Sequence, residues 1–318
     1  MSVTIGVDIG GTKIAGGVVS ATGEILARGR RDTPAQDPDQ IARDVAVLVT
    51  ELQAGRDDVR AVGVACAGFV DRLGSTVLFA PNLAWRDEPL KMRLEALLDL
   101  PVTIENDANA AAWGEFRYGA ATEADDMVLI TVGTGIGGGV VVDSSLLRGA
   151  YGIGGELGHM RVVPDGIRCG CGNRGCWEVY ASGNALVREA RELVASGALS
   201  GVALSESCGG DLSRLQGHDV TSVAQAGDPA AIELLADLGR WLGEGAASVA
   251  AVLDPELIVV GGGVIAAGEL LLTPARAAYA RQLTGRGHRP MAGIVPAALG
   301  NDAGLIGVAA LAAEGVGR

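Results

Sequence analysis

The chain has 318 residues, which is more than one ordinary hydrophobic core holds and predicts two domains. Hydrophobic residues make up 48% and charged residues 20%, a composition typical of folded soluble proteins and not of disordered ones. The net charge of −13 argues against a nucleic-acid partner, because phosphate backbones are bound by basic surfaces.

Nothing in the sequence indicates secretion or a membrane span. No basic segment followed by an apolar one precedes the first strand, and no apolar run reaches the roughly 18 residues that a membrane helix needs. We therefore expect a cytoplasmic protein without a membrane partner. Its 49 glycines are about twice the usual share, and their clusters mark the candidate sites.

The chain opens with a strand, a glycine-rich turn and a second strand. Residues 3–9 are rich in β-branched side chains, and strand character resumes over residues 14–19. The pattern predicts a hairpin, which excludes a Rossmann or Walker loop because both need a helix after the glycines. The tip of this hairpin consists of Gly10, Gly11, Thr12 and Lys13.

A hairpin tip with small side chains can offer backbone N–H groups to phosphate oxygens. Asp8, at the end of the first strand, is placed to hold Mg²⁺ through water. An ordinary glycine turn explains this motif equally well when it is taken alone.

The segments that follow are predicted to be scaffold. An amphipathic helix is expected over residues 38–52, a buried strand over 61–66 and a helix over 90–98. Cys66 lies in the apolar strand and is interpreted as a core thiol. Asn82 lies in a loop between strand and helix.

A short strand over residues 101–105 stops at Asn106 and Asp107, and a helix is predicted from Ala108 to about Phe116. Because Asn and Asp commonly cap helices, a capping role is one interpretation of Asp107. The carboxyl end of a strand is also where α/β enzymes collect their catalytic groups. We favour a functional role for Asp107.

Residues 127–142 repeat the layout of the first hairpin. The sequence V-D-I-G-G-T at 7–12 matches I-T-V-G-T-G at 130–135 in position and character. Two such turns suggest a duplicated nucleotide-binding fold that contacts phosphates from both halves. The second turn contains Gly133, Thr134, Gly135 and Gly137.

Three of the five cysteines lie within residues 169–176, and one of three histidines precedes them. Three thiolates and one imidazole complete a tetrahedral Zn²⁺ shell without an open position, so we predict a structural zinc site and not a catalytic one. A disulfide or incidental buried thiols are the alternatives, but a Cys-x-Cys pair bridges poorly and the cysteine count is odd. The predicted ligands are His159, Cys169, Cys171 and Cys176.

The remaining chain is predicted to hold helices over residues 184–195, 229–253 and 301–313. Residues 196–227 are rich in Gly, Ser and Asp and are expected to be loop and short turns, with Cys208 and His218 in incidental positions. A buried strand then ends in three glycines, which suit either an adenosine or a tight turn. These glycines are Gly261, Gly262 and Gly263.

Taken together, these residues resemble the ROK family of repressors, open reading frames and sugar kinases, and within it the bacterial glucokinases. C-G-C-G-N-R-G-C-W-E at 169–178 and E-L-G-H at 156–159 are the most specific motifs. The resemblance implies an α/β fold, the two-lobed, duplicated actin-like or ribonuclease-H-like architecture with a cleft. It also implies a lobe of residues 1–118 plus 300–318 and a second of residues 119–299, which carries the zinc site.

The resemblance assigns Asp107 as the catalytic base that faces the C6 hydroxyl of a sugar. It places the phosphates of ATP and a Mg²⁺ ion at the first hairpin, with the second glycine turn as a further phosphate loop. His159 would hold zinc with one ring nitrogen and a sugar hydroxyl with the other. The implied sugar-binding set is Gly68, Asn82, Asn106, Asp107, Glu156, His159 and Glu178.

The leading hypothesis is an ATP-dependent glucokinase of glycolysis that acts on a small sugar as a homodimer or homotetramer. The alternatives are another hexose or N-acylhexosamine kinase and a sugar-responsive regulator without catalysis. The regulators carry an N-terminal helix-turn-helix, whereas the first strand here begins at Val3. The sequence does not distinguish ATP from polyphosphate as the donor.

Overall fold

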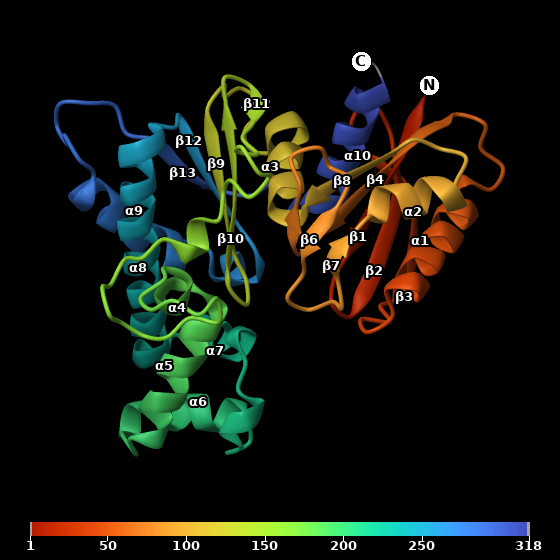
Figure 1. The fold of residues 1–318 in the computed structure, drawn as a ribbon. Coiled ribbons are helices and arrows are strands. Elements are labelled where there is room, and N and C mark those ends of the chain that lie inside the picture. Colours follow the sequence, from red (N-terminus) through yellow and green to blue (C-terminus); the bar gives the residue numbers. More distant parts are fainter. Residues whose placement is uncertain (1, 317–318) are drawn as a thin grey trace. The chain divides into compact units, whose positions relative to one another are not determined.

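The structure is a computed structural model that describes residues 2–316 (Figure 1). It confirms the α/β fold and contains two five-stranded sheets. The first has the strand order β3 (Ile25–Asp32), β2 (Lys13–Val19), β1 (Val3–Ile9), β4 (Val59–Cys66) and β8 (Val102–Asn106). The second has the order β11 (Ser145–Leu146), β10 (Ile136–Val142), β9 (Met127–Val132), β12 (Leu257–Gly261) and β13 (Gly293–Pro296).

The two sheets repeat one topology. In each, a hairpin formed by the first two strands is extended on one side by the third strand and on the other by two later strands. In the first sheet β1 pairs antiparallel with β2 and parallel with β4, and in the second β12 pairs parallel with β13. The duplication inferred from the repeated glycine turns is therefore visible in the strand order.

Helices and one small sheet complete the chain. The small sheet contains β5 (Phe69–Val70), β6 (Val77–Phe79) and β7 (Arg86–Glu88). The helices are α1 (Pro38–Gln53), α2 (Leu90–Leu97), α3 (Asp107–Tyr118), α4 (Glu178–Ala181), α5 (Gly183–Ala195), α6 (Val202–Ser207), α7 (Gly217–Gln225), α8 (Pro229–Leu253), α9 (Glu269–Gln282) and α10 (Ala303–Val316). Short 3₁₀ turns cover Leu157–His159, Leu199–Gly201, Leu212–Arg214, Gly263–Ala267 and Gly300–Asp302.

The first sheet is covered by helices on both faces. The apolar stripe of α1 is buried against one face. It packs so closely that a Cβ on Gly29 of β3 would lie 2.5 Å from a methyl carbon of Leu48. On the other face α10 packs so closely that a Cβ on Gly6 would lie 2.2 Å from the carbonyl oxygen of Leu305. Glycine is required there because any side chain would separate helix and sheet.

The prediction that residues 196–227 are loop and short turns is wrong, because this segment contains α6 and α7. Its helices are short and are held by tertiary burial, with Leu204, Val220 and Ala224 packed in the core. Gln216 and Asp219 form a capping box that starts α7. Helices of this length are marginal alone, so composition gave little signal of them.

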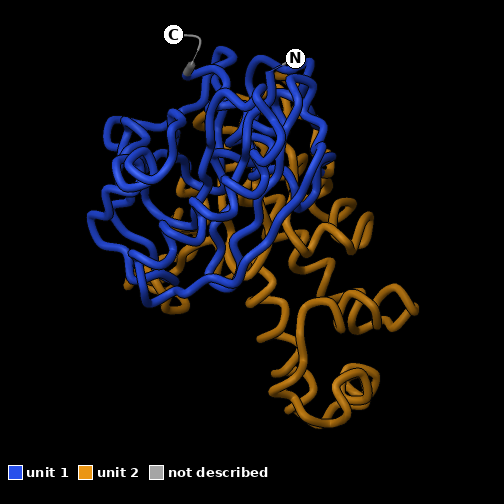
Figure 2. Tube along the Cα trace, turned by 90° about the vertical axis from the view of Figure 1, so that its right-hand side faces the viewer, with its two compact units in different colours: residues 1–129, 139–155, 297–318 blue, residues 130–138, 156–296 orange. Residues whose placement is uncertain are grey.

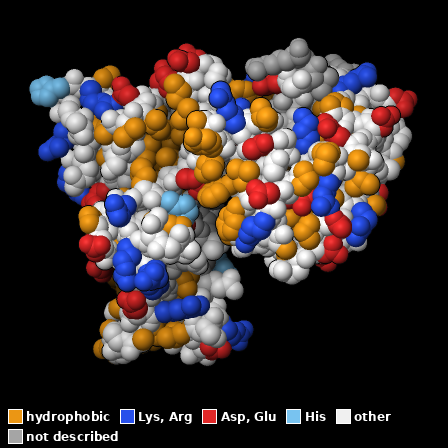
Figure 3. All heavy atoms as spheres, in the orientation of Figure 1, with side chains coloured by type: hydrophobic (Ala, Val, Ile, Leu, Met, Phe, Trp, Pro, Cys, Tyr) orange, Lys and Arg blue, Asp and Glu red, His pale blue; other side chains and the backbone are white. Residues whose placement is uncertain are grey.

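The chain divides into two compact units (Figure 2). Unit 1 contains residues 1–129, 139–155 and 297–318, and unit 2 contains residues 130–138 and 156–296. The lobe boundaries expected from the sequence differ from these units in residues 119–129, 139–155 and 297–299, and they stay a prediction about folding units. Among the described residues, no helix is long and apolar enough to cross a membrane. Acidic and basic side chains are interspersed over the face drawn in Figure 3.

Candidate functional site

The first glycine turn closes a hairpin, as predicted. The amide of Gly10 donates to the carbonyl of Lys13 (2.9 Å), and the Thr33 hydroxyl donates to the carbonyl of Gly10 (2.8 Å). A Cβ on Gly11 would lie 3.3 Å from the Cβ of Asn82. The loop that carries Asn82 therefore packs directly on the hairpin tip, and Gly11 permits that approach.

Two carboxylates lie near this hairpin in unit 1. Burial and then repulsion from Asp107 raise the pKa of Asp8 to about 6, with Lys13 acting in the opposite direction. Burial also raises the pKa of Asp107 above its ordinary value. Two acidic groups that repel each other in a buried place favour a cation or a proton between them.

The start of α3 shows which of two neighbouring polar residues caps the helix. The Asn106 side chain accepts a hydrogen bond from the amide of Asn109 (3.0 Å) and donates to the carbonyl of Gly68 (3.1 Å). Asn106 is therefore the cap of α3. The Asp107 carboxylate accepts from the amide of Ala108 (2.9 Å), so its second oxygen has no role in the cap. The residue that caps α3 is therefore Asn106 and not Asp107.

A residue that sequence reasoning did not single out holds this segment in place. Glu105 is buried, and its carboxylate accepts from the amide of Asn106 (3.0 Å), the side chain of Asn109 (3.2 Å) and Nε of Arg148 (2.6 Å). Glu105 lies in strand β8 before α3 begins, so no helical spacing indicated its contact with Asn109. Arg148 is distant in sequence, and no local pattern indicated it.

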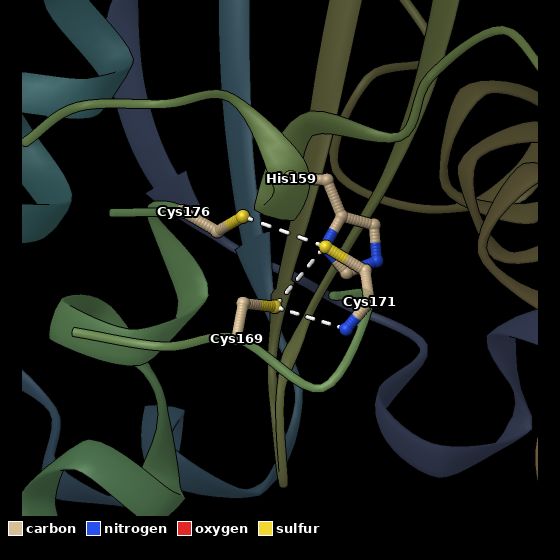
Figure 4. Close-up of side chains that lie close together, drawn as sticks. All are labelled: His159, Cys169, Cys171 and Cys176. Carbon is tan, nitrogen blue, oxygen red and sulfur yellow. Dashed lines mark hydrogen bonds between the residues drawn. The ribbon is translucent and has the colours of Figure 1, made fainter. Parts of the chain in front are cut away.

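The four predicted metal ligands converge in unit 2 (Figure 4). One donor atom from each of His159, Cys169, Cys171 and Cys176 lies within 4.8 Å of all the others. The Sγ atoms of Cys171 and Cys176 are 3.7 Å apart, and Sγ of Cys169 is 3.7 Å from Nδ1 of His159. A tetrahedral zinc site requires about 3.8 Å between sulfurs and about 3.6 Å between sulfur and nitrogen. The donor set and its spacing therefore fit zinc.

The surroundings of the thiols favour a cation there. Burial raises the pKa of the Cys169 and Cys176 thiols above the ordinary value. Thiolates in such a place need a positive partner, and a coordinated metal ion supplies one. Nδ1 of His159 faces the thiols, whereas Nε2 lies 3.9 Å from a carboxylate oxygen of Glu156.

Glu178 connects the thiol cluster to the second glycine turn. One carboxylate oxygen accepts from the Cys169 thiol at 2.9 Å. The other lies 2.4 Å from where a Cβ on Gly135 would stand. Gly135 is therefore needed so that the carboxylate can approach the turn. Glu178 therefore lies between the thiol cluster and the second glycine turn.

The second glycine turn borders a cavity of about 730 Å³ that lies within unit 2. The turn is tied to α5 because the amide of Gly183 donates to the carbonyl of Gly133 (2.8 Å). Gly262 has a φ of 86° and lies against the backbone of Val132, where a side chain would clash. Of the predicted nucleotide residues, those that line the cavity are Gly133, Thr134 and Gly263.

The same cavity has a wall that sequence reasoning missed. Helix α7 contributes His218, Thr221 and Gln225, and α5 contributes Asn184 and Arg191. His218 was expected to be incidental, and the structure places it on the wall of this cavity without testing whether it has a role. The signal was weak because the segment lacked a recognisable helical period.

The duplicated sheets, the paired glycine hairpins and the Cys/His cluster define a member of the ROK family, and residues 4–315 match that family. The chain belongs to it. It is 46% identical over 314 residues to the glucokinase of Streptomyces coelicolor, covering 99% of this chain and 98% of that protein.

Solved structures agree with that assignment. A ROK family glucokinase from Streptomyces griseus, in complex with glucose and AMPPNP, is 47% identical with a TM-score of 0.89, covering 98% of this chain and 100% of that one. A ROK hexokinase from Thermus thermophilus is 35% identical with a TM-score of 0.83, covering 99% of both chains. The actin-like sugar kinase fold expected from the sequence is therefore confirmed.

Proposed function

We propose that this protein is an ATP-dependent glucokinase that transfers the γ-phosphoryl group of ATP to the C6 hydroxyl of D-glucose, forming glucose 6-phosphate. The observation that carries this proposal is the 47% identity, over nearly the whole chain, with a glucokinase that binds glucose and AMPPNP. The geometry supports it, since unit 1 has a buried aspartate at a strand end and unit 2 has a large cavity beside a glycine turn.

Asp107 is the catalytic base of this proposal. Its carboxylate is anchored at one oxygen by the amide of Ala108, and burial raises its pKa. A sugar hydroxyl is a very weak acid, so the base orients the oxygen toward the γ-phosphorus and accepts the proton as the P–O bond forms. The raised pKa makes the carboxylate a better proton acceptor than an exposed aspartate.

Sugar recognition is assigned first to polar side chains of the segment that carries the thiol cluster. Sugar hydroxyls donate to the carboxylates of Glu156 and Glu178. They also bond with Nε2 of His159, which is available because Nδ1 of the same ring faces the thiols. An epimer would leave one of these groups without a partner, which disfavours it. The other members of the proposed sugar-binding set are Gly68, Asn82 and Asn106.

The donor is held by backbone groups of the two glycine turns, with adenosine in the 730 Å³ cavity of unit 2. This assigns phosphate contacts to residues 10–13 and to residues 133–137. Gly261 to Gly263 form the adjoining edge of the nucleotide site. Asp8 would hold Mg²⁺, which neutralises charge on the transferred phosphoryl group when bound.

The metal of the thiol cluster is proposed to be structural Zn²⁺. Its four ligands would leave no position for water, so it takes no part in the chemistry. Its role is to fix the ring of His159 and the segment that carries Glu178.

The five free cysteines fit a reducing cytoplasm. A homodimer or homotetramer is proposed from the family resemblance.

A coupled assay across sugars and donors tests this function. Glucose, mannose, fructose, N-acetylglucosamine and N-acetylmannosamine are compared with ATP, and glucose is then compared with ATP and polyphosphate. We expect the highest kcat/KM for glucose with ATP. A higher value for an N-acylhexosamine would replace the substrate while leaving the kinase assignment intact. Absence of phosphoryl transfer to every sugar would overturn the proposal.

A further inference from the structure

A second cavity, of about 420 Å³, lies in unit 1 and is not used by the proposed reaction. It is bordered by the turn after β5, by the start of β11 and by helices α3 and α10. Two arginines, Arg72 and Arg148, line it, together with the indole of Trp113 and the hydroxyl-bearing Thr103. Such a set of donors suits an anionic ligand.

Basic and acidic side chains both border this cavity, and among the described residues the guanidinium of Arg72 is the unpaired one. Glu314 also lines it, but its carboxylate pairs with Arg117 at 2.7 Å. Arg72 is exposed and has no ion-pair partner among the described residues. Arg148 uses Nε for Glu105, and its side chain remains 31% exposed. In a chain with a net charge of −13, the unpaired guanidinium of Arg72 is the positive charge that an anion would meet in this cavity.

One buried donor in the wall lacks a partner. Trp113 is only 6% exposed, and among the described residues its Nε1 has no hydrogen-bond acceptor. Its ring is held below the guanidinium of Arg117 at 5.8 Å. Buried indole N–H groups normally find an acceptor, so this one points to a ligand atom that completes it.

The cavity is joined to the catalytic segment by a single ion pair. The guanidinium of Arg148 borders the cavity, and its Nε donates to the buried Glu105 at 2.6 Å. Glu105 in turn accepts from Asn106 and Asn109, on either side of Asp107. An anion on the free edge of Arg148 would share the charge that now serves Glu105 alone.

We propose that this cavity binds a small oxyanion, the phosphate or carboxylate group of a metabolite, and that its binding slows phosphoryl transfer through Arg148 and Glu105. The oxyanion accepts from Arg72, from the Nη atoms of Arg148 and from the indole of Trp113. Binding of the oxyanion does not depend on the proposed function. Inhibition by the oxyanion rests on the proposed function of Asp107.

Calorimetry with the full chain tests binding. Inorganic phosphate and malonate are titrated in separate experiments, with glucose and a non-hydrolysable ATP analogue at saturation to fill the donor's phosphate positions. Arg72→Gln is expected to raise the phosphate Kd about tenfold or more, since a charge-assisted bond is lost. Trp113→Phe should raise it less, because it removes one neutral donor. Arg60→Gln, exposed on β4 outside the cavity, is the matched control and should titrate as wild type.

Binding that is absent in wild type, or unchanged in Arg72→Gln, overturns the site. Titration by both anions supports a general oxyanion site, whereas titration by phosphate alone assigns it to phosphorylated metabolites. Initial rates complete the test: phosphate should lower kcat without raising the KM for glucose, and Arg72→Gln should abolish that effect. Inhibition that survives Arg72→Gln overturns the coupling. A chain without kinase activity would refute the proposed function but leave the calorimetric result standing.

Discussion

The two units hold their functional side chains by different means. In unit 1 the segment around Asp107 is fixed by the protein's own bonds: Asn106 caps α3, and the buried Glu105 accepts from Arg148. In unit 2 the segment between His159 and Glu178 is a loop in which three thiols and an imidazole converge. Its only regular elements are a 3₁₀ turn and a short α4.

The difference teaches where a metal is needed. A strand followed by a helix orients polar groups by backbone geometry, so unit 1 requires no ligand to preserve Asp107. The segment of unit 2 has little helix or strand to orient its polar groups, so a bound metal would contribute free energy that orders it. Damage to unit 1 should therefore act on catalysis, and damage to the metal should act on sugar affinity.

The largest effect is expected from Asp107→Asn in unit 1. We expect kcat to fall by about a thousandfold, because a positioned base contributes 10²–10⁴-fold. Glucose affinity, measured by calorimetry, should remain within a few-fold of wild type. Because burial raises the pKa of Asp107, the acid limb of wild-type kcat/KM should lie above the ordinary aspartate range. Near-normal turnover in the variant would remove Asp107 as the base.

The corresponding substitution in unit 2 is Cys171→Ala, which removes one predicted metal ligand. It should lose the metal and weaken glucose affinity by about 10–100-fold, since the imidazole of His159 is no longer oriented. Metal content by plasma emission spectroscopy and the KM for glucose give the two readouts. Cys208→Ala is the control, because that buried thiol lies outside the cluster and should keep both properties. A metal-free wild-type protein purified without chelator would contradict this expectation.

A third prediction concerns the stability cost of the acidic pair in unit 1. The folded pKa of Asp8 is about 6, above the ordinary 3.8, so the folded state binds more protons than the unfolded state between these values. Wild-type stability should therefore fall as pH rises through this window. Asp8→Asn should raise the free energy of unfolding at pH 7 by on the order of 2 kcal/mol while activity is lost.

Urea denaturation of both proteins at pH 4 and pH 7 measures this difference. At pH 4 the carboxyl is largely protonated in the folded state, so the advantage of Asp8→Asn should nearly vanish. An Asp8→Asn protein that is less stable than wild type at pH 7 would show that the carboxylate makes a favourable bond in the folded state.

The smallest effect is expected from a substitution that tests the contact between Glu178 and the second glycine turn. In Gly135→Ala the new Cβ would lie 2.4 Å from an oxygen of Glu178, so the carboxylate must move. We expect the KM for glucose to rise about tenfold with little loss of metal, because a small displacement of a binding group is costly. Gly170→Ala, where nothing lies within 4 Å of the new Cβ, is the control. Equal kinetics in the two variants would separate Glu178 from sugar binding.

Several features of this protein could be predicted from local sequence. The hairpins follow from β-branched runs broken by glycines, and the convergence of His159, Cys169, Cys171 and Cys176 follows from their spacing. The helices expected over residues 184–195 and 229–253 are α5 and α8, because their caps and apolar stripes lie within the segments themselves. The repeated glycine turns also predicted a duplicated fold, and the two sheets have the same strand order.

Other features were decided only by contacts between distant residues. The sequence could not tell which of Asn106 and Asp107 caps α3, since both residue types suit that position. The pairing of Arg148 with Glu105 has no period or spacing that announces it. Helices α6 and α7 are stable because tertiary burial outweighs their weak propensity. Local spacing thus determined the turns, the long helices and the Cys/His cluster, whereas packing determined which of two neighbouring polar residues caps α3 and which distant arginine pairs with Glu105.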